Sequence, residues 1–227
     1  MLRRYTPSIN SSVAIPDDLV APYPVGGAAK RMMDLAIALP SVLVALPVMA
    51  LIAGLILITT GRSPFFAHKR VGFRGYPFPC YKFQTMVPNA QEALAKLLAS
   101  DRDAAREWAN RRKLRHDPRV TRLGWILRKC SLDELPQLIN VLKGDMSCIG
   151  PRPVTTEELE RYGAGAGAYM SARPGITGLW QVTGRSNMDF PTRVSIDQGY
   201  VQNWSLLGDI RILAKTPAAV LRIMETG

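Results

Sequence analysis

The pattern of apolar and polar positions divides the chain into three parts. Residues 1–28 carry four prolines and scattered serines with no apolar period that could bury a face, so we expect a flexible tail there. Residues 35–60 contain no charged residue and are long enough to cross a bilayer once as a helix. After residue 60, polar and apolar positions mix as in a folded domain. We therefore place a tail at 1–28, a membrane segment at 29–62 and a globular domain at 63–227.

Two features of the apolar segment argue against a straight crossing. Pro47, preceded by Leu46, stands near its middle, where a proline removes a backbone hydrogen bond and bends a helix. Both flanks are basic, with Lys30 and Arg31 before the segment and Arg62 after it, and such flanks tend to stay in the cytoplasm. These features predict a re-entrant helix hairpin that breaks at Leu46 and Pro47, with arms of about 18 Å in a hydrocarbon core of about 30 Å. A spanning helix with a proline kink is the alternative.

The rest of the chain predicts a helix-rich α/β domain. Glycine, proline and aromatic residues over 72–86 indicate short strands and turns. The final segment predicts an amphipathic helix that can lie on a membrane surface, with Ile210, Leu213, Val220 and Ile223 on its apolar face. Apolar spacing predicts helices over 89–115, 121–128, 135–142 and 206–224.

The charge balance indicates an anionic partner. Lysine and arginine number 29 against 18 acidic residues, which gives a net charge of +11. This excess suits nucleic acid, anionic lipid headgroups or phosphorylated substrates. A nucleic-acid binder would gather basic and aromatic residues on one face, whereas here the basic residues are dispersed, so no nucleic-acid partner is predicted.

The cysteines and histidines indicate the redox compartment and the kind of metal site that the chain could hold. The three cysteines are widely spaced and lack CxxC pairing, which predicts a reducing compartment and no disulfide framework. Two histidines are too few for a histidine-rich transition-metal site, so carboxylates are the expected ligands of any metal.

The strongest candidate for chemistry is a pair of adjacent acids, Asp133 and Glu134. Ser131 and Glu134 have the spacing of a capping box, which would place Asp133 in a first helical turn, where the helix dipole favours the ionised form. Pro136 suits the start of the following helix. Paired carboxylates can supply a nucleophile or hold Mg²⁺, although acids in a first turn can also serve only as caps.

Several arginines lie close to the acids or on stiff loops. Arg128 precedes the acid pair, Arg152 lies between two prolines, and Arg173 and Arg185 adjoin proline or glycine. Arginines on rigid loops suit bidentate phosphate recognition, although any one of them could be a solvated surface charge. Together, beside an acid pair, they favour a phosphate site.

The string KCSLDELPQLINVLKGDMSCIGPRP at residues 129–153 resembles the signature of bacterial sugar transferases, the monotopic phosphoglycosyl transferases. The resemblance runs in order from about residue 30 to the C-terminus. It departs at Gln84, where the family commonly has arginine, and at Leu46, where a serine often precedes the hairpin proline. Further matching pieces are Lys30-Arg31 with Asp34, Arg70-Val71-Gly72, Tyr81-Lys82-Phe83, and residues 117–121 and 173–182.

The resemblance implies a place and a reaction. The domain would sit on the cytoplasmic face of the bacterial inner membrane, held by the re-entrant hairpin and by amphipathic helices in contact with lipid. It would transfer galactose- or glucose-1-phosphate from a UDP-sugar to undecaprenyl phosphate and release UMP, as the first membrane step of exopolysaccharide synthesis. The oligomeric state stays open, with a homodimer as one option.

The resemblance also assigns roles to residues. Asp133 would form a covalent phosphosugar intermediate and lie near Mg²⁺, while Glu134 would assist as acid or base or hold Arg128. The phosphate-binding residues would be Lys82, Arg128, Arg152, Arg173 and Arg185. A rival hypothesis is a membrane-tethered scaffold that binds anionic lipid and catalyses nothing; it explains the charge and the apolar segment but not the ordered motifs.

Overall fold

A computed structural model describes residues 22–111, 114, 117–183 and 188–226. Most of the predicted N-terminal tail lies outside these residues, and its end at 27–28 belongs to the first helix. The helices are α1 Gly27–Thr60, α2 Ala90–Ser100, α3 Arg102–Arg111, α4 Arg122–Lys129, α5 Gln137–Lys143, α6 Thr156–Glu160, α7 Ala166–Met170, α8 Leu179–Thr183, α9 Phe190–Gln202 and α10 Leu206–Thr226. The strands are β1 Phe65–Val71, β2 Pro77–Phe83, β3 Ser147–Ile149 and β4 Gly175–Thr177, and the 3₁₀ turns are η2 Phe73–Gly75, η3 Leu132–Glu134 and η4 Gly163–Gly165.

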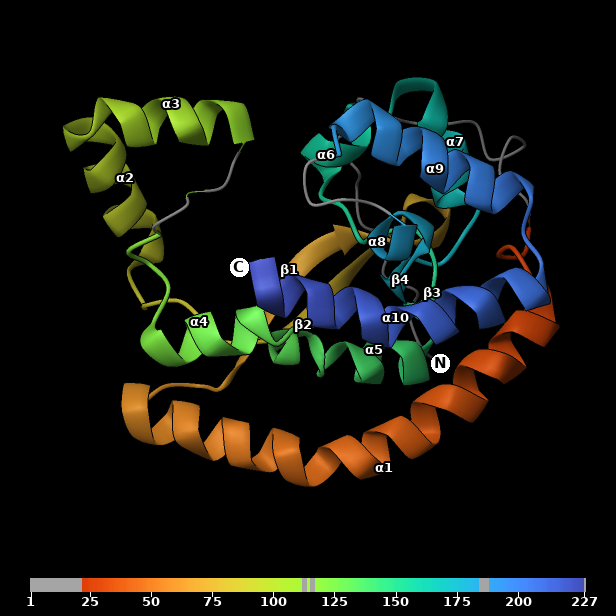
Figure 1. Cartoon of the computed structure of the whole chain (residues 1–227), viewed down its shortest axis with the longest axis horizontal. Helices are drawn as coiled ribbons and strands as arrows, with labels where there is room; N and C mark the ends of the chain where they lie inside the picture. Colours follow the sequence, from red (N-terminus) through yellow and green to blue (C-terminus); the bar gives the residue numbers. More distant parts are fainter. Residues whose placement is uncertain (1–21, 112–113, 115–116, 184–187, 227) are drawn as a thin grey trace, which may run out of the picture.

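The long helix α1 carries the apolar segment and differs from the predicted hairpin. It is one continuous helix that contains both Pro40 and Pro47. Figure 1 shows it bent along one side of the molecule, with its ends directed back toward the domain, rather than folded into two antiparallel arms. Each proline lacks the N–H that would bond one turn back, so the helix bends without breaking. The break predicted at Leu46 and Pro47 is therefore a bend to which Pro40 also contributes.

Helix α1 packs on the domain through one narrow stripe. Met49, Ile52 and Ile56 are buried against Phe83 and Leu127, whereas large apolar side chains elsewhere on the helix are exposed. Within the described chain, α1 is the one helix that is long and apolar enough to cross a membrane. An apolar surface of this extent is what a helix in contact with lipid presents.

Two small sheets lie at the centre of the domain. Strands β1 and β2 form an antiparallel hairpin, and β3 and β4 pair in parallel. Of the short strands predicted over 72–86, β2 is confirmed, while its partner β1 lies wholly before that stretch. Gly150 allows the close approach of the chain after β3 to the chain before β4, because a β-carbon there would collide with the carbonyl oxygen of Arg173.

The predicted helices are confirmed with three changes. The segment 89–115 divides at Asp101 into α2 and α3, which Figure 1 shows as an arm projecting from the rest. Helix α5 starts later than predicted, with Pro136 as its N-terminal cap. On α10 the predicted apolar face is wrong at Ile210, which is half exposed, because the helix packs through Ile212 and Leu213 instead.

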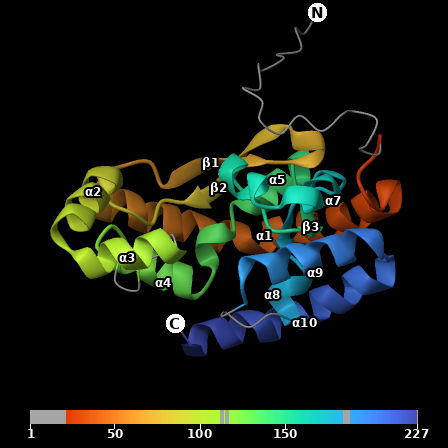
Figure 2. The ribbon, with the colours of Figure 1, turned by 90° about the horizontal axis from the view of Figure 1, so that it is seen from above.

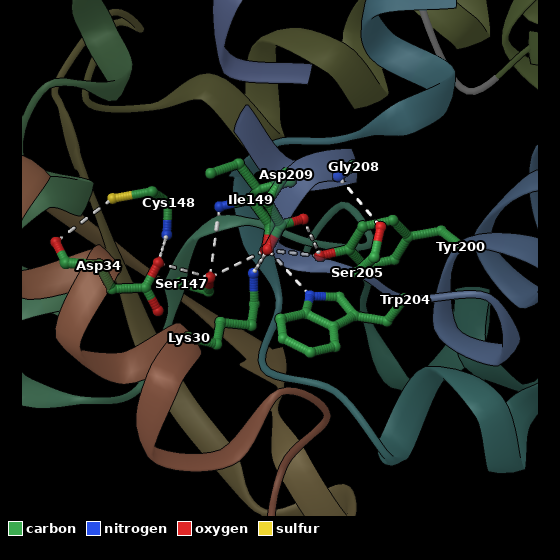
Figure 3. A network of polar contacts seen from close by, with 10 residues as sticks. All are labelled: Lys30, Asp34, Ser147, Cys148, Ile149, Tyr200, Trp204, Ser205, Gly208 and Asp209. Atoms are coloured by element: carbon green, nitrogen blue, oxygen red, sulfur yellow. Dashed lines mark hydrogen bonds and ion pairs between the residues drawn. The ribbon is translucent and has the colours of Figure 1, made fainter. Parts of the chain in front are cut away.

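A buried polar network joins α1 to the C-terminal helices (Figure 3). The Lys30 ammonium lies 2.5 Å from the Asp209 carboxylate, and Asp209 also accepts hydrogen bonds from Tyr200 and Trp204. One turn further along α1, the carboxylate of Asp34 accepts from the Ser147 hydroxyl and the Cys148 amide at the start of β3. The basic and acidic residues before the apolar segment therefore anchor α1 to the domain. Figure 2 shows α8, α9 and α10 gathered on one side of the molecule when it is seen from above.

Candidate active site

The acid pair lies in η3, in the short connection between α4 and α5. Ser131 has φ +56°, in the left-handed region, and its side chain caps no backbone N–H, so the predicted capping box is wrong. The strained turn at Ser131 instead points the two following carboxylates toward β2. A capping box does form at the start of α6, between Thr155 and Glu158.

Lys82 on β2 contacts both acids. Its ammonium nitrogen lies 2.5 Å from Glu134 Oε1 and 3.8 Å from Asp133 Oδ2. Arg152 approaches Glu134 from the opposite loop, with 3.8 Å between Nη2 and Oε1. Glu134 therefore holds Lys82 and Arg152, and the predicted pairing of Glu134 with Arg128 is wrong.

The two neighbouring carboxylates have opposite electrostatic environments. Burial raises the pKa of Asp133, and Glu134 adds to the rise while Lys82 opposes it. Burial also acts to raise the pKa of Glu134, but the charges of Lys82 and Arg152 outweigh it, so the net shift is downward. The expected stabilisation of ionised Asp133 by a helix dipole is therefore wrong, since desolvation dominates at that side chain.

Arg128 is oriented toward Asp133 from α4. Its Nε donates a 2.9 Å hydrogen bond to the Thr85 hydroxyl, and the guanidinium charge acts to lower the pKa of Asp133. Helix α4 can approach Thr85 only because residue 124 is glycine, since a β-carbon at Gly124 would collide with the Thr85 carbonyl oxygen. The neighbouring Gln84 bonds the Met86 carbonyl.

The remaining predicted phosphate ligands do not all converge. Arg152 lies in a narrow cleft with Lys82 and Glu134, next to Arg70, which sequence reasoning left without a role. Arg70 donates to Glu158 at 2.9 Å and stands within the family-like Arg70-Val71-Gly72 motif, which was the available signal. Burial lowers the pKa of Arg173, and the charge of Arg31 on α1 lowers it further while that of Asp34 opposes this. Among the described residues, neither acid of the pair forms an ion pair with Arg173. Arg185 lies outside the described residues.

Asn140 is a positioning residue that the sequence pattern did not single out. It is fully buried, accepts from the Tyr81 amide at 3.0 Å and donates to the Pro79 carbonyl at 2.7 Å. These bonds fasten α5 to β2 and so hold the acid pair at the level of Lys82. A buried amide within an apolar helix was the signal that could have identified it.

The acid pair offers carboxylate oxygens, which suit a hard divalent cation that is bound partly by the protein and partly by the substrate. The described residues contain no cluster of three or more histidine, cysteine or acidic side chains. Mg²⁺ usually takes one or two carboxylates and completes its shell with water and phosphate oxygens, so Asp133 alone fits such a site while Glu134 is engaged by Lys82 and Arg152.

Comparison with known proteins identifies sugar transferases as relatives of this chain. A family model described as bacterial sugar transferase matches residues 25–223. The chain is 45% identical over 219 residues to the exopolysaccharide production protein ExoY of Sinorhizobium fredii, covering 96% of this chain and 97% of that protein. It is 50% identical over 193 residues to the undecaprenyl-phosphate galactose phosphotransferase of Salmonella typhimurium, covering 85% of this chain and 40% of that protein. The UDP-glucose:undecaprenyl-phosphate glucose-1-phosphate transferase of Caulobacter vibrioides is 36% identical over 200 residues, 85% of this chain and 69% of that protein.

Proposed function

Because this chain belongs to the bacterial sugar transferase family, we propose that it transfers galactose- or glucose-1-phosphate from a UDP-sugar to undecaprenyl phosphate in exopolysaccharide synthesis. The relatives named for this transfer support the reaction, and their two sugars are the reason for naming galactose and glucose. The observation that carries the mechanism is the contact of Lys82 with both Asp133 and Glu134.

The reaction proceeds in two displacements at one phosphorus. A lone pair of the Asp133 carboxylate forms a bond to the β-phosphorus of the UDP-sugar, and the bond from that phosphorus to the bridging oxygen breaks, releasing UMP. An oxygen of undecaprenyl phosphate then bonds to the same phosphorus, and the aspartyl oxygen leaves as a carboxylate. The product is undecaprenyl-diphospho-sugar. Mg²⁺ held by Asp133 and the phosphates would neutralise diphosphate charge.

The residues around Asp133 support each part of this chemistry. Burial removes water from the Asp133 carboxylate and raises its pKa. A partly desolvated carboxylate with a raised pKa is a stronger nucleophile toward phosphorus. Lys82, Arg128, Arg152 and Arg70 supply positive charge for the diphosphate. Glu134 stays ionised and holds Lys82 and Arg152 in place, which makes it a positioning residue in this mechanism.

A panel of UDP-sugars tests the proposed reaction. The purified full chain, given Mg²⁺ and undecaprenyl phosphate, should release UMP with UDP-galactose or UDP-glucose and form a lipid-linked sugar diphosphate. UMP is quantified enzymatically and the lipid product by mass spectrometry. Absence of UMP release with every donor, from folded protein, would favour the scaffold hypothesis instead.

The bend in α1 supports a cytoplasmic placement for both of its ends. We expect cysteines introduced at Met32 and Arg62, both exposed, to react with a membrane-impermeant maleimide only from the cytoplasmic face. The half-buried Cys130 is first replaced by serine, while Cys80 and Cys148 are buried. Replacing both helix prolines by alanine should straighten α1 and move Arg62→Cys to the opposite face. Labelling of Arg62→Cys from the periplasmic face with both prolines present would establish a spanning helix.

The proposed nucleophile predicts a pH effect of Lys82. Asp133 must be ionised to attack, so activity falls as the pH drops through its pKa, which burial has raised. Lys82 opposes that rise, so its replacement by methionine should raise the pKa of Asp133 further and move the acid limb of the kcat profile to higher pH. Lys69→Met removes the same charge from an exposed position on β1 and should leave the limb in place. Identical acid limbs in both variants would contradict the assignment.

A further inference from the structure

A second cavity lies away from the acid pair, between α8, α9 and the start of α10. Its volume is about 220 Å³, and it shares no lining residue with the cleft around Lys82 and Glu134. Leu179 and Ile212 contribute apolar surface, and Trp204 forms one wall. The cavity is smaller than the roughly 300–1,000 Å³ of a typical small-molecule site, so a larger molecule would occupy it only in part.

Two cations on α10 border this cavity. Arg211 and Lys215 line it one helical turn apart, and both side chains are exposed. Among the described residues neither has an acidic partner. None of the described residues that line the cavity is acidic. The nearby Asp209 is fully buried and already engaged by Lys30, Tyr200 and Trp204. The mouth of the cavity is therefore positively charged above an apolar interior, which suits an amphiphile with an anionic head.

The surroundings of the cavity place it where a lipid headgroup would lie. Trp204 donates to Asp209, which is paired with Lys30 in the first turn of α1, five residues before the uncharged stretch begins (Figure 3). Helix α10 exposes Leu207 and Ile210 close to Arg211 and Leu221 further along the helix. A helix with an exposed apolar stripe next to basic residues suits the boundary between headgroups and acyl chains.

We infer that this cavity is a binding site for an anionic phospholipid. The lipid phosphate is held between Arg211 and Lys215, and the first part of an acyl chain packs against Leu179 and Ile212. The inference rests on the membrane attachment through α1 included in the proposed function. A lipid bound here would secure the junction of α1 with α10 at the membrane surface.

Native mass spectrometry of the full chain in detergent, titrated with phosphatidylglycerol or phosphatidylcholine, tests the cationic part of the site. We expect the unmodified chain to bind one molecule of phosphatidylglycerol more tightly than phosphatidylcholine. Binding should weaken by at least about tenfold in the double variant Arg211→Gln/Lys215→Gln. Lys96→Gln/Arg102→Gln removes the same charge from exposed positions on α2 and α3 and should bind like the unmodified chain. Equal weakening in both double variants would show that binding depends only on net charge, and the proposed site would be wrong.

Gly199→Leu tests the apolar part while leaving both cations in place. Gly199 lines the cavity from α9, and a β-carbon there would meet no atom within 4 Å. Leucine therefore fills the cavity and also favours the helix more than glycine does, so the variant should fold. We expect it to lose the tight phosphatidylglycerol molecule; unchanged binding would overturn the proposal.

Competition with undecaprenyl phosphate and a parallel transferase assay separate this proposal from a catalytic role of the cavity. If undecaprenyl phosphate displaces phosphatidylglycerol at lower concentration, the cavity is a carrier-lipid site and the phospholipid proposal is wrong. UMP release is measured on the same preparations and reports on the reaction separately, since the cavity and the cleft share no residue. Loss of tight phosphatidylglycerol binding in Gly199→Leu with UMP release retained supports a lipid site distinct from catalysis.

Discussion

Replacing Asp133 with asparagine is expected to abolish UMP release, lowering the rate by at least about 1,000-fold. Asparagine has nearly the same shape and can occupy the same buried position beside Lys82. Its amide has no anionic oxygen to attack phosphorus, so the first displacement fails while folding is preserved. UMP release with UDP-galactose and UDP-glucose measures the effect.

The same exchange at a surface position provides the control. Asp103 is exposed on α3, and Asp103→Asn should retain full activity. Mass spectrometry of the denatured chain, trapped with donor sugar before the acceptor is added, should find a phosphosugar on the peptide that contains Asp133. Full activity in Asp133→Asn, or an unmodified Asp133 peptide during turnover, would exclude the covalent mechanism.

Replacing Lys30 with methionine is expected to lower the free energy of unfolding by about 3–5 kcal/mol. Lys30 pairs with Asp209, and both side chains are buried between α1 and α10. Removing the cation leaves a buried carboxylate with only the neutral donors Tyr200 and Trp204. Denaturant unfolding of the chain in detergent, followed by tryptophan fluorescence, measures the change.

Two further variants separate the ion pair from other effects of the substitution. Lys30→Met/Asp209→Leu removes both charges and should recover much of the lost stability, because no uncompensated charge remains. Lys96→Met makes the same replacement at an exposed position and should change stability by less than about 0.5 kcal/mol. If Lys30→Met behaves like Lys96→Met, the buried pair does not anchor α1.

The arrangement of the acid pair shows where local patterns mislead. The spacing of Ser131 and Glu134 fits a capping box, yet Ser131 adopts a left-handed conformation and the capping box forms at Thr155 and Glu158. Both pairs have the same sequence signature, so spacing alone could not decide between them. The deciding factor is packing, because β2 and Asn140 hold the acids against Lys82.

Charge pairing and burial at the site were also decided by packing rather than by local sequence. A basic residue near an acid in sequence is no guide to its partner, since Glu134 pairs with Lys82 and Arg152 rather than with Arg128. The upward pKa shift of Asp133 comes from desolvation, which depends on the side chains that cover it rather than on its position in a helical turn.

The sequence by itself determined the apolar segment, most of the helices, the excess of positive charge and the acid pair as the centre of the chemistry. These features depend on residue type and on neighbours within a few positions, where periodicity and propensity act. Only the tertiary structure decided that α1 is bent rather than folded back, which cations meet the acids, and that Lys30 and Asp209 join the two ends of the described chain. The ion pairs depend on contacts between residues 50 to 180 positions apart, and the free energy of such contacts is set by burial and geometry that appear only when the whole domain packs.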